Sequence, residues 1–292
     1  MNSHARIAIG VLALALLAGA AALLYVRARM TPRFPYFAQS LDSADYARLA
    51  AQPGWTPVAL DVDGGATLRG LLREPTSAAA PWLVFFNGNS NNLLREGQQL
   101  LDALCAEHGW GGVVWAYRGF DSSGGEPGPA VLVEDGVRSY RQLLEDRHLS
   151  PADVHLVGFS LGTTIASAVA ARERDRPPAS LVLMAPAGRL YMGDKLQLRL
   201  DHYETLRWLH SIASPVLVLH GRDDATLPID NARRVAQALG PRATLLELPG
   251  RGHLDLLQAT DAHEAIRAFV TARINGRGTS PSPAEPASRG GT

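Results

Sequence analysis

Three places in this chain carry side chains that could together transfer an acyl group: Ser160, the pair Asp223-Asp224, and His253. A serine hydroxyl is a poor nucleophile at neutral pH. It needs a base that takes its proton and a carboxylate that orients the base. These residues follow one another as Ser, then Asp, then His, which is the order used on an open α/β sheet. We therefore predict that Ser160 attacks a carbonyl carbon with His253 as its base.

Ser160 is the centre of Gly158-Phe159-Ser160-Leu161-Gly162, which fits the pattern G-x-S-x-G. Such a short pattern can arise by chance, so the flanking segments decide whether it marks a nucleophile. An apolar strand is expected over 154–157 and a helix of small residues over 161–174, which together form the strand–turn–helix setting of a nucleophile. A side chain in place of either glycine would crowd the packing of the helix on the strand. The backbone N–H of Leu161 is then expected to donate to the oxyanion of the reaction.

The acid and the base follow two later apolar runs. The expected strand over 216–219 leads into His220-Gly221-Arg222-Asp223-Asp224, and the one over 244–248 leads into Pro249-Gly250-Arg251-Gly252-His253. Both segments lie just beyond the carboxyl ends of strands, where ligands bind in open α/β sheets. Of the other histidines, His155 and six more have no matching context, and we expect them on the surface or in the core.

The rest of the chain alternates apolar runs with helical patterns, which predicts a mostly parallel sheet covered by helices on both faces. Further strands are expected over 67–73, 82–86, 112–117 and 181–184, and further helices over 95–108, 131–145, 231–239 and 264–274.

The segment Pro215 to Asp224, followed by Pro228, resembles the acid loop of the alpha/beta-hydrolase family, and Gly250-Arg251-Gly252-His253 is similar to the family's histidine loop. The resemblance covers roughly 57–274 and is nearest to a membrane-anchored group with a short lid. It implies an alpha/beta-hydrolase fold. It favours Asp224 over Asp223, because the acid usually stands three residues after the glycine. It also implies that His220 is structural.

The family most often carries His-Gly where this chain has Asn87-Gly88. The resemblance implies that the main-chain N–H of Asn89 is the second oxyanion donor, whereas a role taken from the missing histidine does not transfer. The segment Tyr117 to Gly124 is similar to the family loop after the fourth strand, which implies that Arg118 holds this loop beside the site. A lid is expected in 187–212, either as a small apolar cap or as an ordinary helix on the sheet.

The two ends are expected to lie outside the fold. Ile7 to Val26 is a run of 20 residues without a charge, which matches a membrane-spanning helix better than the shorter apolar region of a cleaved signal peptide. Flanking arginines lean towards a cytoplasmic catalytic domain. The Gly-, Ser- and Pro-rich end predicts a disordered tail. The expected organisation is a membrane anchor over 1–29, a linker over 30–53, a catalytic domain over 54–275 and the tail over 276–292.

Composition excludes several other classes of function. The chain has 28 basic and 28 acidic residues, which gives no electrostatic reason to bind nucleic acid. One cysteine, Cys105, allows no intrachain disulfide. No histidine or carboxylate cluster has the spacing of metal ligands, so neither a metal nor a cofactor is expected.

The predicted function is hydrolysis of an acyl bond, with a carboxylic ester favoured, through an acyl-enzyme on Ser160. The expected substrate is a small or lipid-like acyl compound, because an anchor concentrates membrane-borne substrates near the site. A thioester or a peptide bond stays open on the same residues. The alternative from another class is a membrane-tethered binding protein on a hydrolase scaffold.

Overall fold

The computed structural model describes residues 16–20, 36–38, 43–90, 92–188, 191–192, 198–199 and 205–277. The α-helices are α2 (Ser43–Ala50), α3 (Leu93–Cys105), α4 (Pro129–Arg147), α5 (Leu161–Arg172), α6 (Asp230–Leu239) and α7 (Thr260–Arg277). The strands are β1 (Thr56–Val62), β2 (Ala66–Arg73), β3 (Trp82–Phe86), β4 (Gly111–Trp115), β5 (Val154–Phe159), β6 (Ser180–Met184), β9 (Val216–Gly221) and β10 (Ala243–Leu248), with the short pair β7 (Tyr191–Met192) and β8 (Leu198–Arg199).

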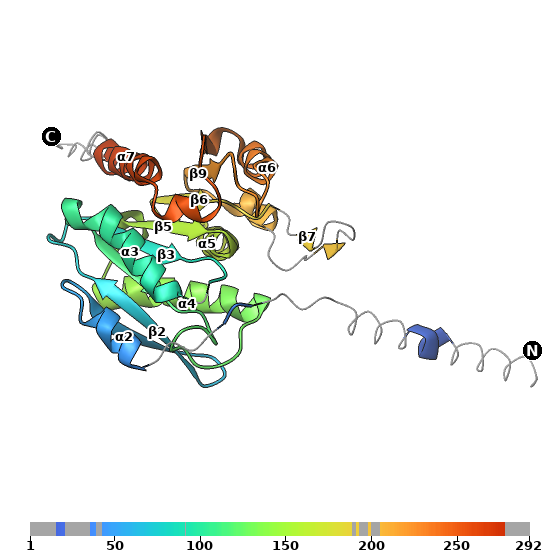
Figure 1. Cartoon of the computed structure of the whole chain (residues 1–292), viewed down its shortest axis with the longest axis horizontal. Coiled ribbons are helices and arrows are strands. Elements are labelled where there is room, and N and C mark those ends of the chain that lie inside the picture. Colours follow the sequence, from blue (N-terminus) through green and yellow to red (C-terminus); the bar gives the residue numbers. More distant parts are fainter. Residues whose placement is uncertain are drawn as a thin grey trace, which may run out of the picture. The chain divides into compact units, whose positions relative to one another are not determined.

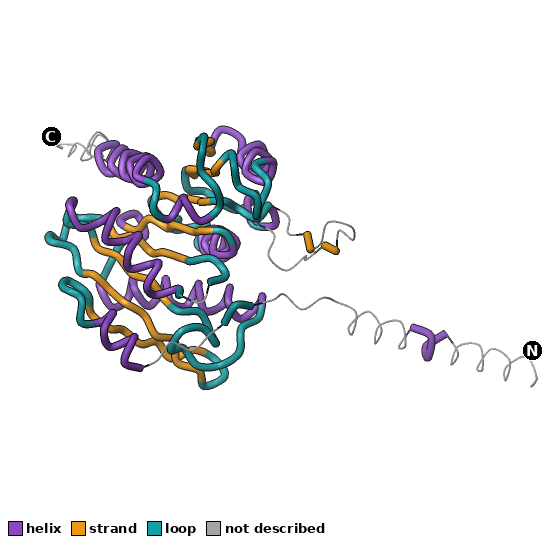
Figure 2. Tube along the Cα trace, in the orientation of Figure 1, coloured by secondary structure: helices purple, strands orange, loops and turns teal. Residues whose placement is uncertain are grey.

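Eight strands form one sheet in the order β1-β2-β4-β3-β5-β6-β9-β10 (Figures 1 and 2). β1 pairs antiparallel with β2 and β2 antiparallel with β4, while every pairing from β4 to β10 is parallel. The predicted mostly parallel sheet is therefore confirmed. A parallel sheet brings the carboxyl ends of its strands to one edge, and the segments after β3, β5, β9 and β10 meet there.

Helices cover both faces of this sheet, as β3 shows. All five of its residues are buried, and successive side chains of a strand point to opposite faces. Phe85 lies beside Gly97 of α3, whereas Phe86 lies beside Gly136 of α4 together with Ile165 of α5. α3 therefore packs on one face and the contacting pair α4 and α5 on the other.

β1 and α2 were not predicted from the sequence. β1 alternates exposed and buried residues at the edge of the sheet. α2 falls in the range expected to be a linker, yet its Leu49 is buried in the core. The Leu49 carbonyl accepts a hydrogen bond of 2.9 Å from Gln98 Nε2 of α3. α2 is therefore held by tertiary contacts with α3, which the local sequence pattern does not predict.

The remaining predictions about the ends and the lid fall mostly outside the described residues. Of the expected span 7–26 only residues 16–20 are described, and they are helical. Among described residues, no helix has both the length and the apolar character needed to cross a membrane. Most of the expected tail, from 278 onward, is also outside. Within the described residues of 187–212 there is no α-helix: β7 pairs with β8, and 205–207 and 209–211 are short 3-10 turns.

Candidate active site

Ser160 lies in a sharp turn between β5 and α5, where its backbone has φ 50° and ψ −116°. A positive φ is costly for a residue with a Cβ, so the surrounding structure must impose it. The Ser160 N–H donates to the Met184 carbonyl at 2.9 Å, and Thr163 Oγ1 donates to the Ser160 carbonyl at 2.6 Å. These bonds fix the main chain of Ser160 and leave its hydroxyl free to project from the turn.

The glycines of the G-x-S-x-G pattern permit this turn, as predicted. A Cβ at Gly158 would lie 2.7 Å from the Gly162 carbonyl oxygen and 2.9 Å from Thr163 Cα. A Cβ at Gly162 would overlap the carbonyl oxygens of Phe86 and Asn87. No side chain fits at either place, because the first turn of α5 packs directly on the ends of β3 and β5.

The structure brings Ser160, His253 and Asp224 together. His253 Nε2 lies 3.0 Å from Ser160 Oγ, and His253 Nδ1 lies 2.7 Å from Asp224 Oδ2. With the proton on Nδ1, His253 donates to the carboxylate and accepts from the serine hydroxyl, a tautomer assigned from this network. The Phe159 ring, 5.0 Å from the imidazole centroid to centroid, packs on the side of His253. This is the geometry required of a nucleophile, a base and an orienting acid.

Asp224 rather than Asp223 makes this contact, since Asp224 is buried and Asp223 is exposed. Asp224 Oδ1 accepts from the N–H groups of Thr226 and Leu227, each at 2.8 Å. Burial opposes ionisation, but hydrogen bonds from His220, His253 and the Leu227 N–H outweigh it and hold the pKa of the Asp224 carboxyl well below its ordinary value. A carboxylate that stays ionised can keep His253 oriented at any working pH.

The loops that carry the acid and the base are tied to each other. The Asp223 N–H donates to the Arg251 carbonyl at 3.0 Å, and a Cβ at Gly221 would overlap the same carbonyl oxygen. His220, which is fully buried, lies with Nε2 2.8 Å from the Leu227 carbonyl and 3.3 Å from Asp224 Oδ2. It supports the acid loop and does not contact Ser160, in keeping with the structural role expected for it.

The two residues predicted as oxyanion donors, Leu161 and Asn89, lie in segments next to Ser160. Leu161 is the first residue of α5, so its N–H has no partner within the helix. The loop after β3 passes directly over the serine, because a Cβ at Gly88 would lie 3.3 Å from Ser160 Cβ. Asn89 is the next residue of that loop, and its Oδ1 accepts from the Phe37 N–H at 3.0 Å. Asn87 points inward, fully buried, with Nδ2 bonded to the Leu93 carbonyl at 3.1 Å.

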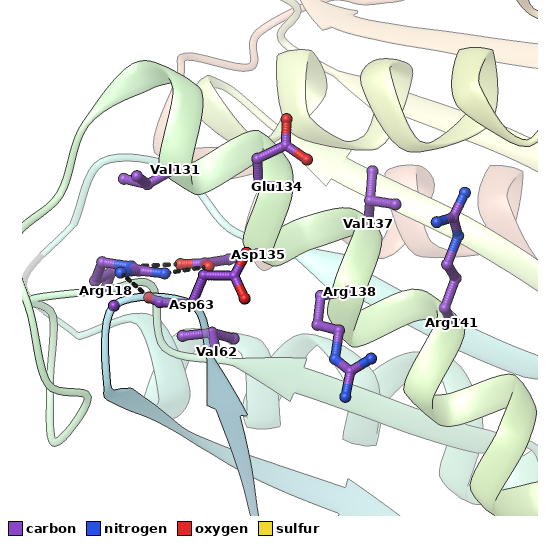
Figure 3. A pocket seen from close by; sticks show the side chains of 10 residues that line it. Val62, Asp63, Arg118, Val131, Glu134, Asp135, Val137, Arg138 and Arg141 are labelled. Atoms are coloured by element: carbon purple, nitrogen blue, oxygen red, sulfur yellow. Dashed lines mark hydrogen bonds and ion pairs between the residues drawn. The ribbon is translucent and has the colours of Figure 1, made fainter.

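Two other features could be mistaken for the site. A pocket of 570 Å³ lies between the β1–β2 turn, Arg118 and α4 (Figure 3). It contains neither a serine nor a histidine, and its buried ion pair joins Arg118 to Asp135 at 2.6 Å and 2.9 Å. Arg118 Nη1 also donates to the Asp63 carbonyl at 2.7 Å. These bonds hold the loop after β4, the role expected for Arg118, and the pocket has no serine–histidine pair like that of Ser160 and His253.

The second feature is a contact of 2.7 Å between His155 Nδ1 and Ser180 Oγ. Both residues are completely buried, and they face each other across β5 and β6 near the starts of these strands. Ser160 follows the opposite end of β5. A substrate cannot reach Ser180, so this contact belongs to the core, where His155 was expected as one of two possibilities.

Comparison with known proteins identifies the class. Residues 81–204 match the family model described as alpha/beta hydrolase fold, and residues 202–281 match one described as TAP-like protein. Together with the fold, these matches show that the chain belongs to the alpha/beta-hydrolase family. The family match and the esterase and lipase neighbours support a hydrolase and leave open which bond it cleaves.

Individual relatives are distant. An uncharacterised protein of Mycobacterium tuberculosis is 29% identical over 232 residues, which are 75% of this chain and 80% of that protein. A lysophosphatidylserine lipase of Danio rerio, ABHD12, is 22% identical over 200 residues, which are 57% of this chain and 52% of that protein. The crystal structure of a membrane phospholipase A, described as a bacterial virulence factor, has a TM-score of 0.60 at 18% identity and covers 92% of this chain and 99% of that one.

Proposed function

We propose that the chain is a serine hydrolase that cleaves a carboxylic ester through an acyl-enzyme on Ser160. The observation that supports this most directly is the continuous path of hydrogen bonds from Ser160 Oγ through His253 to Asp224, with lengths of 3.0 Å and 2.7 Å. Ser160 is partly exposed at the end of β5, where a substrate carbonyl can approach it.

In the first half-reaction Ser160 Oγ attacks the carbonyl carbon and passes its proton to His253 Nε2. The new C–O bond converts the carbonyl oxygen into an oxyanion, which the N–H groups of Leu161 and Asn89 stabilise. The C–O bond to the leaving alcohol then breaks, and the alcohol oxygen takes the proton back from His253. In the second half-reaction a water molecule gives a proton to His253 and attacks the acyl carbon. The bond from that carbon to Ser160 Oγ then breaks, Oγ takes the proton back from His253, and the acid is released.

The ionised Asp224 makes these transfers possible. It accepts the Nδ1–H of His253, which leaves Nε2 as the acceptor, and it stabilises the imidazolium that each proton transfer creates. His220 and the Leu227 N–H, together with Thr226, occupy the remaining acceptor positions of Asp224. Asp224 therefore keeps a single orientation towards His253.

The proposed substrate is a lipid-like ester, and the chain is proposed to be anchored by residues 7–26. The support is the charge-free run of 20 residues, whose length suits a bilayer, and the lipid-hydrolysing activities in the names of ABHD12 and the phospholipase A. The exposed side chain of Leu254 beside His253 would also suit an apolar acyl chain.

Labelling with a fluorophosphonate, followed by mass spectrometry of the labelled peptide, tests the nucleophile. We expect the label on Ser160 and its loss in Ser160→Ala. Labelling that persists undiminished in that variant would overturn the assignment of Ser160. A series of p-nitrophenyl esters of rising chain length, run beside matched thioesters and peptides, tests the bond. Turnover of thioesters or peptides without turnover of any ester would replace the ester proposal, and labelling without turnover of any substrate would favour a binding protein.

A further inference from the structure

The loop after β3 is pressed against the proposed nucleophile, so its position and that of Ser160 are coupled. A Cβ at Gly88 would lie 3.3 Å from Ser160 Cβ and 3.1 Å from Phe159 Cδ1. The main chain of this loop therefore runs close beside Ser160, with little room for a side chain between them. A small shift of this loop therefore moves the Asn89 N–H relative to the oxygen that the reaction charges.

One carboxylate, on the first turns of α3, binds this loop on both sides of Asn89. Glu96 Oε2 accepts from Asn87 Nδ2 at 2.9 Å, and Glu96 Oε1 accepts from Ser90 Oγ at 2.7 Å. The two donors stand two residues before and one residue after Asn89. Hydrogen bonds to an ionised acceptor are shorter and stronger than neutral ones, which suits a group that has to hold a loop in place.

Both polar atoms of the Asn87 side chain are hydrogen-bonded in this arrangement. It is buried, its Nδ2 also donates to the Leu93 carbonyl at 3.1 Å, and its Oδ1 accepts from the Gly88 N–H at 2.6 Å. Tyr117 Oη donates to the Asn87 carbonyl at 2.6 Å from the other side. Asn87 thus links Glu96 to the loop.

The helix that carries Glu96 is fixed at the same end. Asp121 is 2% exposed, and its Oδ2 accepts from the Leu94 N–H at 2.8 Å. Asp121 has φ 45°, a backbone conformation that glycine adopts more readily. Asp121 at this position, in place of glycine, supplies a carboxylate. That carboxylate holds the start of α3, and with it Glu96, against the loop after β4.

We propose that Glu96 is a positioning residue of the oxyanion hole, which acts through Asn87 and Ser90 to hold the Asn89 N–H against Ser160. This rests on the proposed function. Donors stabilise an oxyanion because they are fixed before the charge develops. A loosened loop should therefore still bind substrate but stabilise the transition state less. The loss should appear in kcat, while KM changes little.

The test compares Glu96→Gln with Asp102→Asn in the full chain. Glutamine keeps the shape of Glu96 but removes its charge. Its amide oxygen can still accept from Asn87 Nδ2, but Ser90 Oγ must then accept from the amide nitrogen instead of donating, so both charge-assisted bonds are lost. Asp102 is a matched control: it lies on the same helix, and its Oδ1 accepts from Trp55 Nε1 and Arg73 Nη1, each at 3.0 Å. It is at the far end of α3 from the loop.

We expect Glu96→Gln to lower kcat for a p-nitrophenyl ester by about 10–100-fold, less than the loss of a complete oxyanion donor, with KM within about threefold. The rate of inactivation by a fluorophosphonate should fall in parallel, because the phosphoryl oxygen occupies the same hole. Asp102→Asn should lower the melting temperature without changing kcat. Ser90→Ala, at a partly exposed position, should lower kcat by a smaller factor. The double variant Glu96→Gln/Ser90→Ala should lose less than the product of the two single losses, because both variants disturb the same Glu96–Ser90 contact.

Equal kcat in Glu96→Gln and Asp102→Asn would overturn the proposal, as would additive losses in the double variant. A variant of Glu96 that does not fold leaves Ser90→Ala to decide, and an unchanged kcat there counts against the proposal. Retention of activity by Ser160→Ala would instead refute the proposed function itself. The two failures are thus distinguishable.

Discussion

Two His–Ser contacts between described residues lie at opposite ends of the same strand and have nearly the same length. His253 Nε2 is 3.0 Å from Ser160 Oγ just after the end of β5, and His155 Nδ1 is 2.7 Å from Ser180 Oγ near its start. The buried contact is the shorter one. Distance between a base and a hydroxyl therefore does not identify an active site.

What separates the two contacts is access and backbone geometry. Ser160 is partly exposed and has φ 50° in its turn, whereas Ser180 is completely buried as the first residue of β6. Strained backbone persists where surrounding structure enforces it, and such places concentrate at functional sites. Parallel strands present their carboxyl ends to ligands, and Ser160 is at that end.

Replacing each serine by alanine should separate the two contacts most strongly. We expect Ser160→Ala to lower kcat by about 10⁴-fold or more, because the attacking atom is gone. Ser180→Ala should leave kcat unchanged, because no substrate reaches it. Ester turnover with purified variants measures both. Comparable losses of kcat in the two variants would break the comparison.

The acid should show the next largest effect. Asp224→Asn keeps the shape of the side chain but removes the charge that fixes the tautomer of His253, and we expect kcat to fall by about 10²–10⁴-fold. Asp223→Asn is the matched control, since Asp223 is the exposed neighbour, and should retain its kcat. Loss of activity in Asp223→Asn alone would transfer the role to the other aspartate.

The ionisation of Asp224 should also make the stability of the fold depend on pH. The pKa of Asp224 is lowered in the folded chain, by hydrogen bonds from His220, His253 and Leu227 that outweigh burial. A carboxyl with a lowered folded-state pKa stabilises the fold above its unfolded pKa of about 4, and that contribution is lost as pH falls towards the folded-state value. Urea unfolding of the wild-type chain and Asp224→Asn should therefore differ most near neutral pH and converge as the pH falls below about 4. A difference that grows on acidification would contradict the sign.

The turn that distinguishes Ser160 depends on Gly162. Replacing Gly162 should have a smaller effect, which we expect on the stability of the fold. A Cβ at Gly162 would overlap the main chain of β3, and overpacking of this kind costs up to about 3 kcal/mol. We expect Gly162→Ala to lower the free energy of unfolding by about that amount, measured in urea. Gly124→Ala is the control, because neither Gly162 nor Gly124 has a positive φ, and the nearest atom to a Cβ at Gly124 is 3.7 Å away, an ordinary contact distance. Equal effects in the two variants would mean that the overlap with the main chain of β3 does not limit the residue at 162.

The sequence predicts this site better than the elements around it. β3, β5 and β9 are continuous apolar runs, which local pattern detects, and the glycines at 158 and 162 have a steric reason that the structure bears out. β1 is an edge strand with exposed residues, and α2 is held by tertiary contacts such as the bond between Gln98 and the Leu49 carbonyl. Local pattern does not contain that information.

The residues that hold the candidate site in position also could not be predicted from the sequence. The sequence draws attention to Asn87 only because the resemblance implies a histidine at this position. Its partner Glu96 stands nine residues away on α3 and matches no motif. Pairing of this kind depends on how helix and loop turn towards each other, which spacing alone does not give. A polar residue at an unexpected position, followed by a carboxylate near the start of the next helix, is the signal that could have suggested it.

The smallest expected effect concerns the buried contact itself. Ser180→Ala leaves a ring nitrogen of His155 without its hydroxyl partner inside the core, and an unsatisfied buried group costs about 1–3 kcal/mol. Replacing both residues, as Ser180→Ala/His155→Leu, removes the partners together and should recover part of that loss. Urea unfolding of the two singles and the double gives the coupling free energy, with ester turnover as a check that Ser160 is unaffected. If the double variant loses the sum of the singles, the hydroxyl and the imidazole do not stabilise each other. The contact would then reflect the packing of β5 against β6 alone.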